Sequence, residues 1–141
     1  MAALTIETYR EYIKKEAFKD YDKEYALEAI GKVVNEYEVQ VFYPKKLFIE
    51  NSSEEELYFF ENNQVKVLKI KDNLVKVNLF KYKEIVKTEY SFETKNVRSS
   101  EIKLYFANDE SISLNSNEDT NDHWSPEFSN KILDIYNLLS K

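Results

Sequence analysis

The sequence predicts an α+β fold. A pair of N-terminal helices precedes a seven-stranded antiparallel meander, which we expect to form a barrel or a strongly curved sheet capped by a C-terminal amphipathic helix. The first observation is the stretch 56–92, where short runs rich in Val, Ile, Phe and Tyr are separated by Asn and Asp. Such runs are typical of consecutive strands joined by tight turns. The second is the helical spacing of apolar residues on either side of that stretch.

Composition limits the classes of protein to consider. The 141 residues are expected to form one domain, with a helical extension at 1–38, strands within 39–115 and a last helix at 125–140. A net charge of -6 predicts no direct binding to nucleic acid, and the lack of cysteine excludes disulfides and thiolate metal sites. No run reaches the length of a membrane span or a signal peptide, so we expect a cytoplasmic protein. The bias toward Lys, Asn, Ile, Glu and Tyr indicates an AT-rich bacterial or phage genome.

Two helices are predicted before the strands. Thr8 followed by Glu11 matches a capping box, with Thr5 as an alternative cap, and predicts a helix over about residues 5–18. Gly31 lies inside the second helix, where we expect it to allow close packing against the sheet. The second helix is indicated by apolar residues spaced three, four and three apart, namely Leu27, Ile30, Val34 and Tyr37.

Seven strands are counted from residue 47 onward. The first is 47–50, although 39–43 also has strand composition before Pro44. In the run 65–71 the apolar positions change phase, which predicts a β-bulge. The run that follows carries three apolar residues on what we take as its core face, namely Val75, Val77 and Leu79. The segment 93–100 is predicted to be a polar linker, and 102–114 is the clearest hairpin.

The last helix has the strongest start signal in the chain. Ser125, Pro126 and Glu127 supply a cap, a proline at the first helical position and an acid in the first turn. Its buried stripe is predicted to consist of Phe128, Ile132, Ile135 and Leu139, flanked by Leu133 and Tyr136.

Seven strands followed by one amphipathic helix resemble the pleckstrin-homology (PH) superfamily over about residues 45–140. The resemblance is one of topology and implies a PH-like barrel plugged at one end by the helix. The family's tryptophan lies within that helix, whereas Trp124 here precedes it, and the two N-terminal helices are additional. A plain α+β domain with one curved antiparallel sheet is the alternative fold.

The same resemblance implies binding either of phosphoinositides or of peptides and proteins. The phosphoinositide mode needs basic side chains in the loop between the first two strands. That loop here carries Glu54, Glu55 and Glu56, which would repel a phosphate. We therefore expect no phosphoinositide binding and expect a protein or peptide partner.

Four aromatic residues form the first candidate contact surface. They have the opposite parity to the apparent core residues of their strands, and they are Tyr58, Phe60, Phe80 and Tyr82. If they are exposed, they form an apolar patch large enough to mark a partner surface. The alternative is that the N-terminal helices cover them, because the apolar stripe of the second helix needs such a surface.

Lysines form the second candidate surface. Residues 64–88 hold seven Lys against Asp72 and Glu84. Lys76, opposite the expected core face of its strand, would belong to a basic strip for an acidic partner. The alternative is an ordinary solvated strand face that protects a sheet edge from aggregation.

His123 and Trp124 are the only His and the only Trp, and they adjoin the last helix. They are a candidate partner contact because Trp is favoured in binding hot spots. The alternative is a hydrophobic staple in which Trp124 packs onto the first turn of the helix. The neighbouring loop spaces Asn115, Asn117 and Asp119 as a calcium loop does, but Thr120 replaces the required Gly, so we predict no metal site.

No motif for catalysis or cofactor binding stands out, and we expect neither an enzyme nor a cofactor. One His, no Cys and one Gly remove most nucleophile–base pairs and any Gly-rich phosphate loop. The sequence favours a non-enzymatic protein- or peptide-binding module that uses strand addition or groove docking. One alternative is an acidic phage- or immunity-type inhibitor whose carboxylates, from 50–56 and 115–127, block a basic nucleic-acid-binding surface. The other is a homo-oligomeric structural protein.

Overall fold

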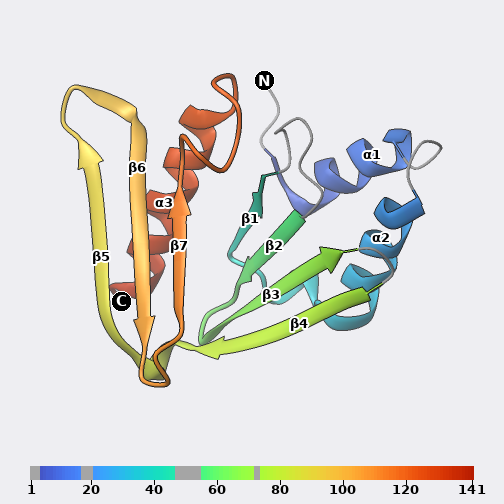
Figure 1. Ribbon diagram of the computed structural model, residues 1–141, viewed down its shortest axis with the longest axis horizontal. Helices are drawn as coiled ribbons and strands as arrows, with labels where there is room; N and C mark the ends of the chain where they lie inside the picture. The colour runs from blue at the N-terminus through green and yellow to red at the C-terminus, as the bar shows by residue number, and fades with distance from the viewer. Residues whose placement is uncertain (1–3, 17–20, 47–54, 72–73) are drawn as a thin grey trace.

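A computed structural model of the protein describes residues 4–16, 21–46, 55–71 and 74–141 (Figure 1). The predicted α+β class is confirmed, with N-terminal helices, two antiparallel sheets and a C-terminal helix. In chain order the elements are α1 (Ile6–Glu16), α2 (Tyr21–Val33), the 3-10 helix η1 (Glu36–Glu38), β1 (Val41–Lys45), β2 (Glu55–Phe60), β3 (Gln64–Lys71), β4 (Leu74–Lys81), the 3-10 helix η2 (Tyr82–Glu84), β5 (Ile85–Glu93), β6 (Asn96–Phe106), β7 (Ser111–Asn115) and α3 (Ser125–Leu139).

The strands form a meander that is divided into two sheets. The first sheet has the order β1-β2-β3-β4 and the second the order β5-β6-β7, with every neighbouring pair antiparallel. Figure 1 shows the two sheets diverging from the corner where β4 runs into β5. Among the described residues no closed or strongly curled sheet is found, so the barrel part of the prediction is not supported.

One strand boundary differs from the prediction, and one predicted strand cannot be compared because it falls outside the described residues. The first strand is β1 at Val41–Lys45, whereas the predicted strand 47–50 lies outside the described residues. Pro44 is accommodated because, among the described residues, β1 is an edge strand that pairs with β2 alone. The predicted polar linker 93–100 is instead a hairpin, because β5 extends to Glu93 and β6 begins at Asn96.

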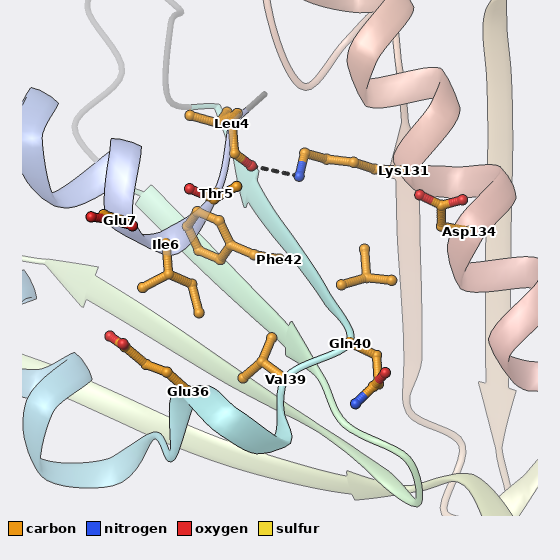
Figure 2. A pocket seen from close by; sticks show the side chains of 11 residues that line it. Leu4, Thr5, Ile6, Glu7, Glu36, Val39, Gln40, Phe42, Lys131 and Asp134 are labelled. Carbon is orange, nitrogen blue, oxygen red and sulfur yellow. Dashed lines mark hydrogen bonds between the residues drawn. The ribbon is translucent and has the colours of Figure 1, made fainter. Parts of the chain in front are cut away.

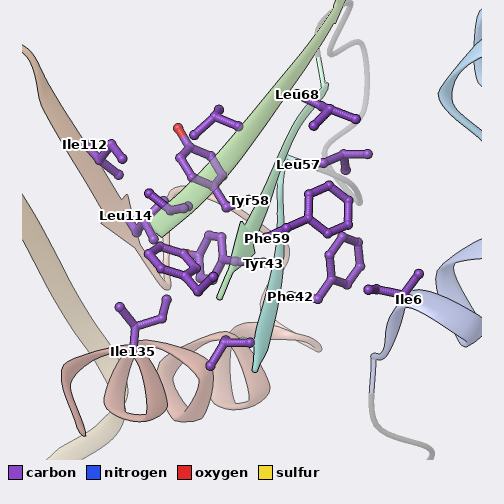
Figure 3. Packing of buried hydrophobic residues seen from close by; sticks show 14 of the residues in the cluster. Ile6, Phe42, Tyr43, Leu57, Tyr58, Phe59, Leu68, Ile112, Leu114 and Ile135 are labelled. Atoms are coloured by element: carbon purple, nitrogen blue, oxygen red, sulfur yellow. The ribbon is translucent and has the colours of Figure 1, made fainter. Parts of the chain in front are cut away.

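β2 and β3 are buried on both faces. Figure 3 shows Phe42 and Phe59 on the side of Ile6, while Tyr43 and Tyr58 lie on the side of Ile135. Double-sided burial also explains why the apolar positions of β3 change phase. Its register with both neighbouring strands is continuous, so the predicted bulge is wrong.

α1 and α2 cover one face of the first sheet. Tyr9 of α1 is fully buried, and its ring meets Phe42 edge-on at 5.4 Å. Thr5, the alternative cap, begins α1, because Thr5 N donates to Thr8 Oγ1 at 2.7 Å and Thr8 N donates to Thr5 Oγ1 at 3.2 Å. Within the described part of the chain, none of the helices is long and apolar enough to span a membrane.

Two expectations about α2 are wrong. The helix ends at Val33, so the last member of its predicted stripe, Tyr37, lies in η1 and is 98% exposed. Gly31 is exposed, and a Cβ added there would meet no atom within 4 Å, so close packing does not explain this glycine.

α3 and the second sheet cover the other face of the first sheet. Phe128 and Ile132 are fully buried, and the Phe128 ring lies 4.9 Å from that of Tyr43 on β1. Ser129 Oγ lies 2.8 Å from Ser100 Oγ and ties α3 to β6. The predicted amphipathic helix is therefore confirmed, and it is packed along the second sheet and against β1 (Figure 1).

β4 departs from the predicted parity at two of its three expected core residues, while the third, Val75, is partly buried and packs against the core. Val77 and Leu79, expected in the core, are 38% and 57% exposed, whereas Phe80 is partly buried and its ring lies 4.8 Å from that of Phe106. Val77 and Leu79 share the face that α1 and α2 cover over β1–β3, but β4 is the edge strand and is covered less completely.

A buried ion pair joins β2–β3 to α2. Glu61 is 3% exposed, and its Oε2 lies 3.2 Å from Lys66 Nζ. Lys66 Nζ also donates to Val33 O at 3.0 Å, at the C-terminal end of α2, where the helix dipole favours a cation. The ammonium therefore neutralises a buried carboxylate and also binds the carbonyl end of α2.

Replacement of Lys66 is expected to be strongly destabilising. Lys66→Met should lower the free energy of unfolding by about 3 kcal/mol, measured by urea denaturation, because the Glu61 carboxylate would stay buried without its cation. The double variant Glu61→Gln with Lys66→Met should lose less than Lys66→Met alone. Lys69→Met, at a lysine whose side chain is 52% exposed, is the control, and an equal loss in both single variants would contradict the argument.

Candidate functional site

The predicted aromatic contact residues lie largely in the interior. Tyr58 is 4% exposed and Phe60 is fully buried, so this structure makes neither accessible to a partner. They are covered, as the alternative interpretation required, but the cover is α3 and the second sheet rather than the N-terminal helices. Burial raises the pKa of Tyr58 well above its ordinary value, with Glu56 and Asp119 adding to the shift.

Phe80 and Tyr82 are partly buried at the corner between the two sheets. Tyr82 OH donates to Glu61 O at 2.6 Å, and Tyr82 N donates to Asn63 O at 3.1 Å. Burial, followed by the nearby Glu61, raises the pKa of Tyr82 well above its ordinary value. Tyr82 therefore holds the corner between β4 and β5 against the β2–β3 turn, and Phe80 packs against Phe106 of β6.

Lys76, His123 and Trp124 are not brought together with the aromatic residues. Lys76 is exposed on β4, directly opposite Lys69 of β3. His123 is exposed, and its ring meets that of Trp124 edge-on at 5.7 Å. Trp124 is half-buried and packs against the hydrophobic core, in agreement with a packing role at the start of α3.

The loop with calcium-like spacing fastens β7 to β1. Asp119 Oδ2 accepts hydrogen bonds from Tyr43 OH and from Asn115 N, each at 2.7 Å. Asn115 Oδ1 accepts from Asn117 N at 2.9 Å. Burial raises the pKa of Asp119, although Lys45 and these hydrogen bonds oppose the shift. In the described residues, no three acidic or histidine side chains are grouped so as to hold a metal ion.

A surface that the sequence reasoning missed lies between β5 and α3. The Tyr90 ring of β5 stacks on that of Tyr136 of α3 at 4.8 Å, and the Phe92 ring lies 5.3 Å from Tyr90. Phe92, Leu133 and Tyr136 are nevertheless 58%, 42% and 39% exposed. We call these four residues, Tyr90, Phe92, Leu133 and Tyr136, the β5–α3 patch.

β5 also presents a free backbone edge beside this patch. It is the terminal strand of its sheet and, in the part of the chain that the structure describes, pairs only with β6. Register irregularities between Ile85 and Lys87 and between Phe92 and Glu93 bound a regular segment, 87–92. Exposed strand edges of this kind can hydrogen-bond to an added strand.

A second region of interest is the contact between Leu4 and α3. Leu4 N donates to Glu127 Oε1 at 2.7 Å, and Lys131 Nζ donates to Leu4 O at 2.7 Å, a bond that Figure 2 draws. A depression of about 370 Å³ lies beside this contact, lined by Gln40, Phe42 and Asp134 among others. Burial lowers the pKa of Lys131 to about 8, although Glu127 and Asp134 oppose the shift. The Lys131 ammonium is thus used to hold the chain segment before α1.

Comparison with known proteins identifies a family. The family model described as "Protein of unknown function (DUF3908)" matches residues 5–130 of the chain. A search of the curated proteins finds no match.

The pKa of Lys131 predicts a dependence of stability on pH. The folded protein releases this proton near pH 8, whereas the unfolded chain holds it to about 10.5, so burial of the ammonium costs stability below pH 8. The free energy of unfolding of the natural protein should therefore rise between about pH 8 and pH 9.5 relative to Lys131→Met. Urea denaturation across this range checks it, and parallel profiles for the two proteins would contradict it.

Proposed function

The chain belongs to the DUF3908 family, and we propose that it is a small, non-enzymatic module that binds an extended protein or peptide segment along β5. The observation that carries the proposal is the β5–α3 patch, which lies next to a free strand edge. We also propose a PH-like arrangement, supported by the order of four strands, three strands and a C-terminal helix.

Strand addition fits the position of the patch. Tyr90 and Phe92 are two residues apart on β5, so both side chains point to the same face of the sheet. Tyr136 of α3 reaches that face and stacks on Tyr90. A peptide strand paired with 87–92 would therefore place alternate side chains beside Leu133 and Tyr136. Backbone hydrogen bonds would provide affinity and the patch would select apolar residues.

The exposed rings favour a binding role over a purely structural one. Side chains of this size normally stabilise a fold by about 2 kcal/mol when they are fully buried. Phe92 gains only part of that energy, since it is 58% exposed, and its ring contacts that of Tyr90. A partner that covers the patch would bury the remaining apolar area.

The inhibitor alternative finds less support. Of the carboxylates that it needs, Asp119 is buried on Tyr43, and Glu127 accepts a hydrogen bond from Leu4 N. Glu56 lies 3.5 Å from Lys69 Nζ. Residues 50–54 fall outside the described chain.

Substitutions in the patch should remove peptide binding without unfolding the protein. Peptides selected on the natural protein from a displayed library of random peptides should bind Phe92→Ala and Tyr136→Ala at least about tenfold more weakly. Isothermal titration calorimetry measures the affinities. Tyr37→Ala, which removes a fully exposed ring far from β5 in the sequence, is the matched control and should bind normally. Failure to select any peptide, or equal affinity in all variants, would exclude the proposal.

Self-association through β4 is a second candidate, favoured by one observation. β4 is one of the two edge strands of the first sheet, and Leu74 and Leu79 on it are 66% and 57% exposed. If β4 pairs with β4 of a second copy, the natural protein should sediment as a dimer and Leu79→Lys as a monomer, because a buried lysine would oppose the contact. A monomeric natural protein in sedimentation equilibrium would rule this candidate out.

A further inference from the structure

A basic pocket lies at the corner where β4 leads into β5. It has a volume of about 370 Å³ and is lined by residues from three separate segments, the β2–β3 turn, the β4–η2 corner and the end of α3. Figure 1 shows the end of α3, marked C, close to this corner. We define the basic pocket by its polar lining residues, which are Asn62, Asn63, Lys81, Tyr82, Lys83 and Lys141.

The charge of this pocket is opposite to that of the chain. Three lysines, Lys81, Lys83 and Lys141, line it in a protein of net charge -6, and no Asp or Glu is among the lining residues. Within the described residues, none of the three lysines takes part in an ion pair. Like charges held near one another repel, so an anion placed among them would be attracted by all three.

The frame that holds these lysines is fixed by hydrogen bonds. Tyr82 lies between Lys81 and Lys83 and is bonded through N to Asn63 O and through OH to Glu61 O, at 3.1 and 2.6 Å. Edge protection explains a single lysine on a strand, and a helix C-terminus explains a lysine such as Lys141. Neither explanation accounts for the presence of strand lysines and the C-terminal lysine in one pocket. Two asparagines also line this pocket, and asparagine amides can donate hydrogen bonds to anions.

The basic pocket lies at one end of the β5–α3 patch. β5 begins two residues after Lys83, and α3 ends three residues after Tyr136. The two elements run in opposite directions (Figure 1), so the start of β5 and the end of α3 meet at the same end of the patch. Glu93 stands at the other end of β5, beside a pocket that Glu101 also lines. The charge along β5 therefore changes from positive to negative.

We propose that the basic pocket receives an anionic group, a carboxylate or a phosphate, carried near one end of the peptide segment that binds along β5. This inference rests on the proposed function and adds a polarity to it. Apolar side chains of the peptide contact the β5–α3 patch, and its acidic end lies among Lys81, Lys83 and Lys141.

The test uses synthetic peptides that share one core of alternating Val and Phe. The first set is a pair of peptides, one with two Glu at its N-terminus and one with two Glu at its C-terminus. The second set is the same pair with two phosphoserines in place of Glu. The third is a single peptide with Gln at both ends. Calorimetry should show the acidic peptides binding about tenfold more tightly than the Gln peptide, since three exposed charge contacts contribute modestly each. The difference between the Glu and phosphoserine sets identifies the preferred anion.

The matched variants isolate the pocket. The triple variant Lys81→Gln, Lys83→Gln, Lys141→Gln should abolish the preference for acidic peptides and leave the affinity for the Gln peptide unchanged. The triple variant Lys14→Gln, Lys15→Gln, Lys32→Gln makes the same change of net charge on exposed lysines of α1 and α2 and should keep the preference. Urea denaturation of both variants checks that they remain folded.

The outcomes separate this inference from the proposed function. Equal binding of acidic and Gln peptides would overturn the inference while peptide binding stands. If no peptide binds, the proposed function fails. The anion site is then tested by NMR, with sodium phosphate added to the protein in one titration and sodium chloride, at equal ionic strength, in the control titration. Amide shifts at Asn62 and Asn63 that are lost in the pocket variant would support an anion site, and no shift would overturn it.

Discussion

Burial of both faces of β2 and β3 is the constraint on which the rest of the structure depends. Phe59 points toward α1 and α2, and Tyr58 on the same strand points toward α3 and the second sheet. Each such ring stabilises the fold by about 2–3 kcal/mol only if its own side is covered. The chain therefore needs helices on one face and a second sheet with a helix on the other, which accounts for α1, α2, α3 and the second sheet.

This constraint also decides where a partner can bind. The inner faces of both sheets are filled by the core, and α3 directs Phe128 and Ile132 into it. Accessible parts include two sheet edges, β4 in the first sheet and β5 in the second, and the flank of α3 that carries Leu133 and Tyr136.

The sequence predicts an element well when its residue pattern is compatible with only one structure. Ser125 and Pro126 mark the start of α3, and the hairpin containing Ile102 alternates cleanly because only one face of the second sheet is packed. The expected alternation of buried and exposed residues fails for Tyr58 because it assumes that only one face of the strand is buried. It fails for Leu79 because the helices cover an edge strand less completely. The β5–α3 patch depends on how far α3 extends beside β5, which is non-local information that residue spacing does not contain. The apolar residues of α3 beside its buried stripe were the one indication of this patch in the sequence.

The contact between Leu4 and α3 has a consequence for the order of folding. Leu4 is bonded to Glu127 and Lys131, which lie 123 and 127 positions further along the chain. Closing a loop of that length costs more conformational entropy than forming any hairpin of the meander, and both bonding groups exist in place only after α3 has docked. This contact is therefore expected to form late during refolding, and its opening would release the segment before α1 from α3 while the two sheets stay assembled.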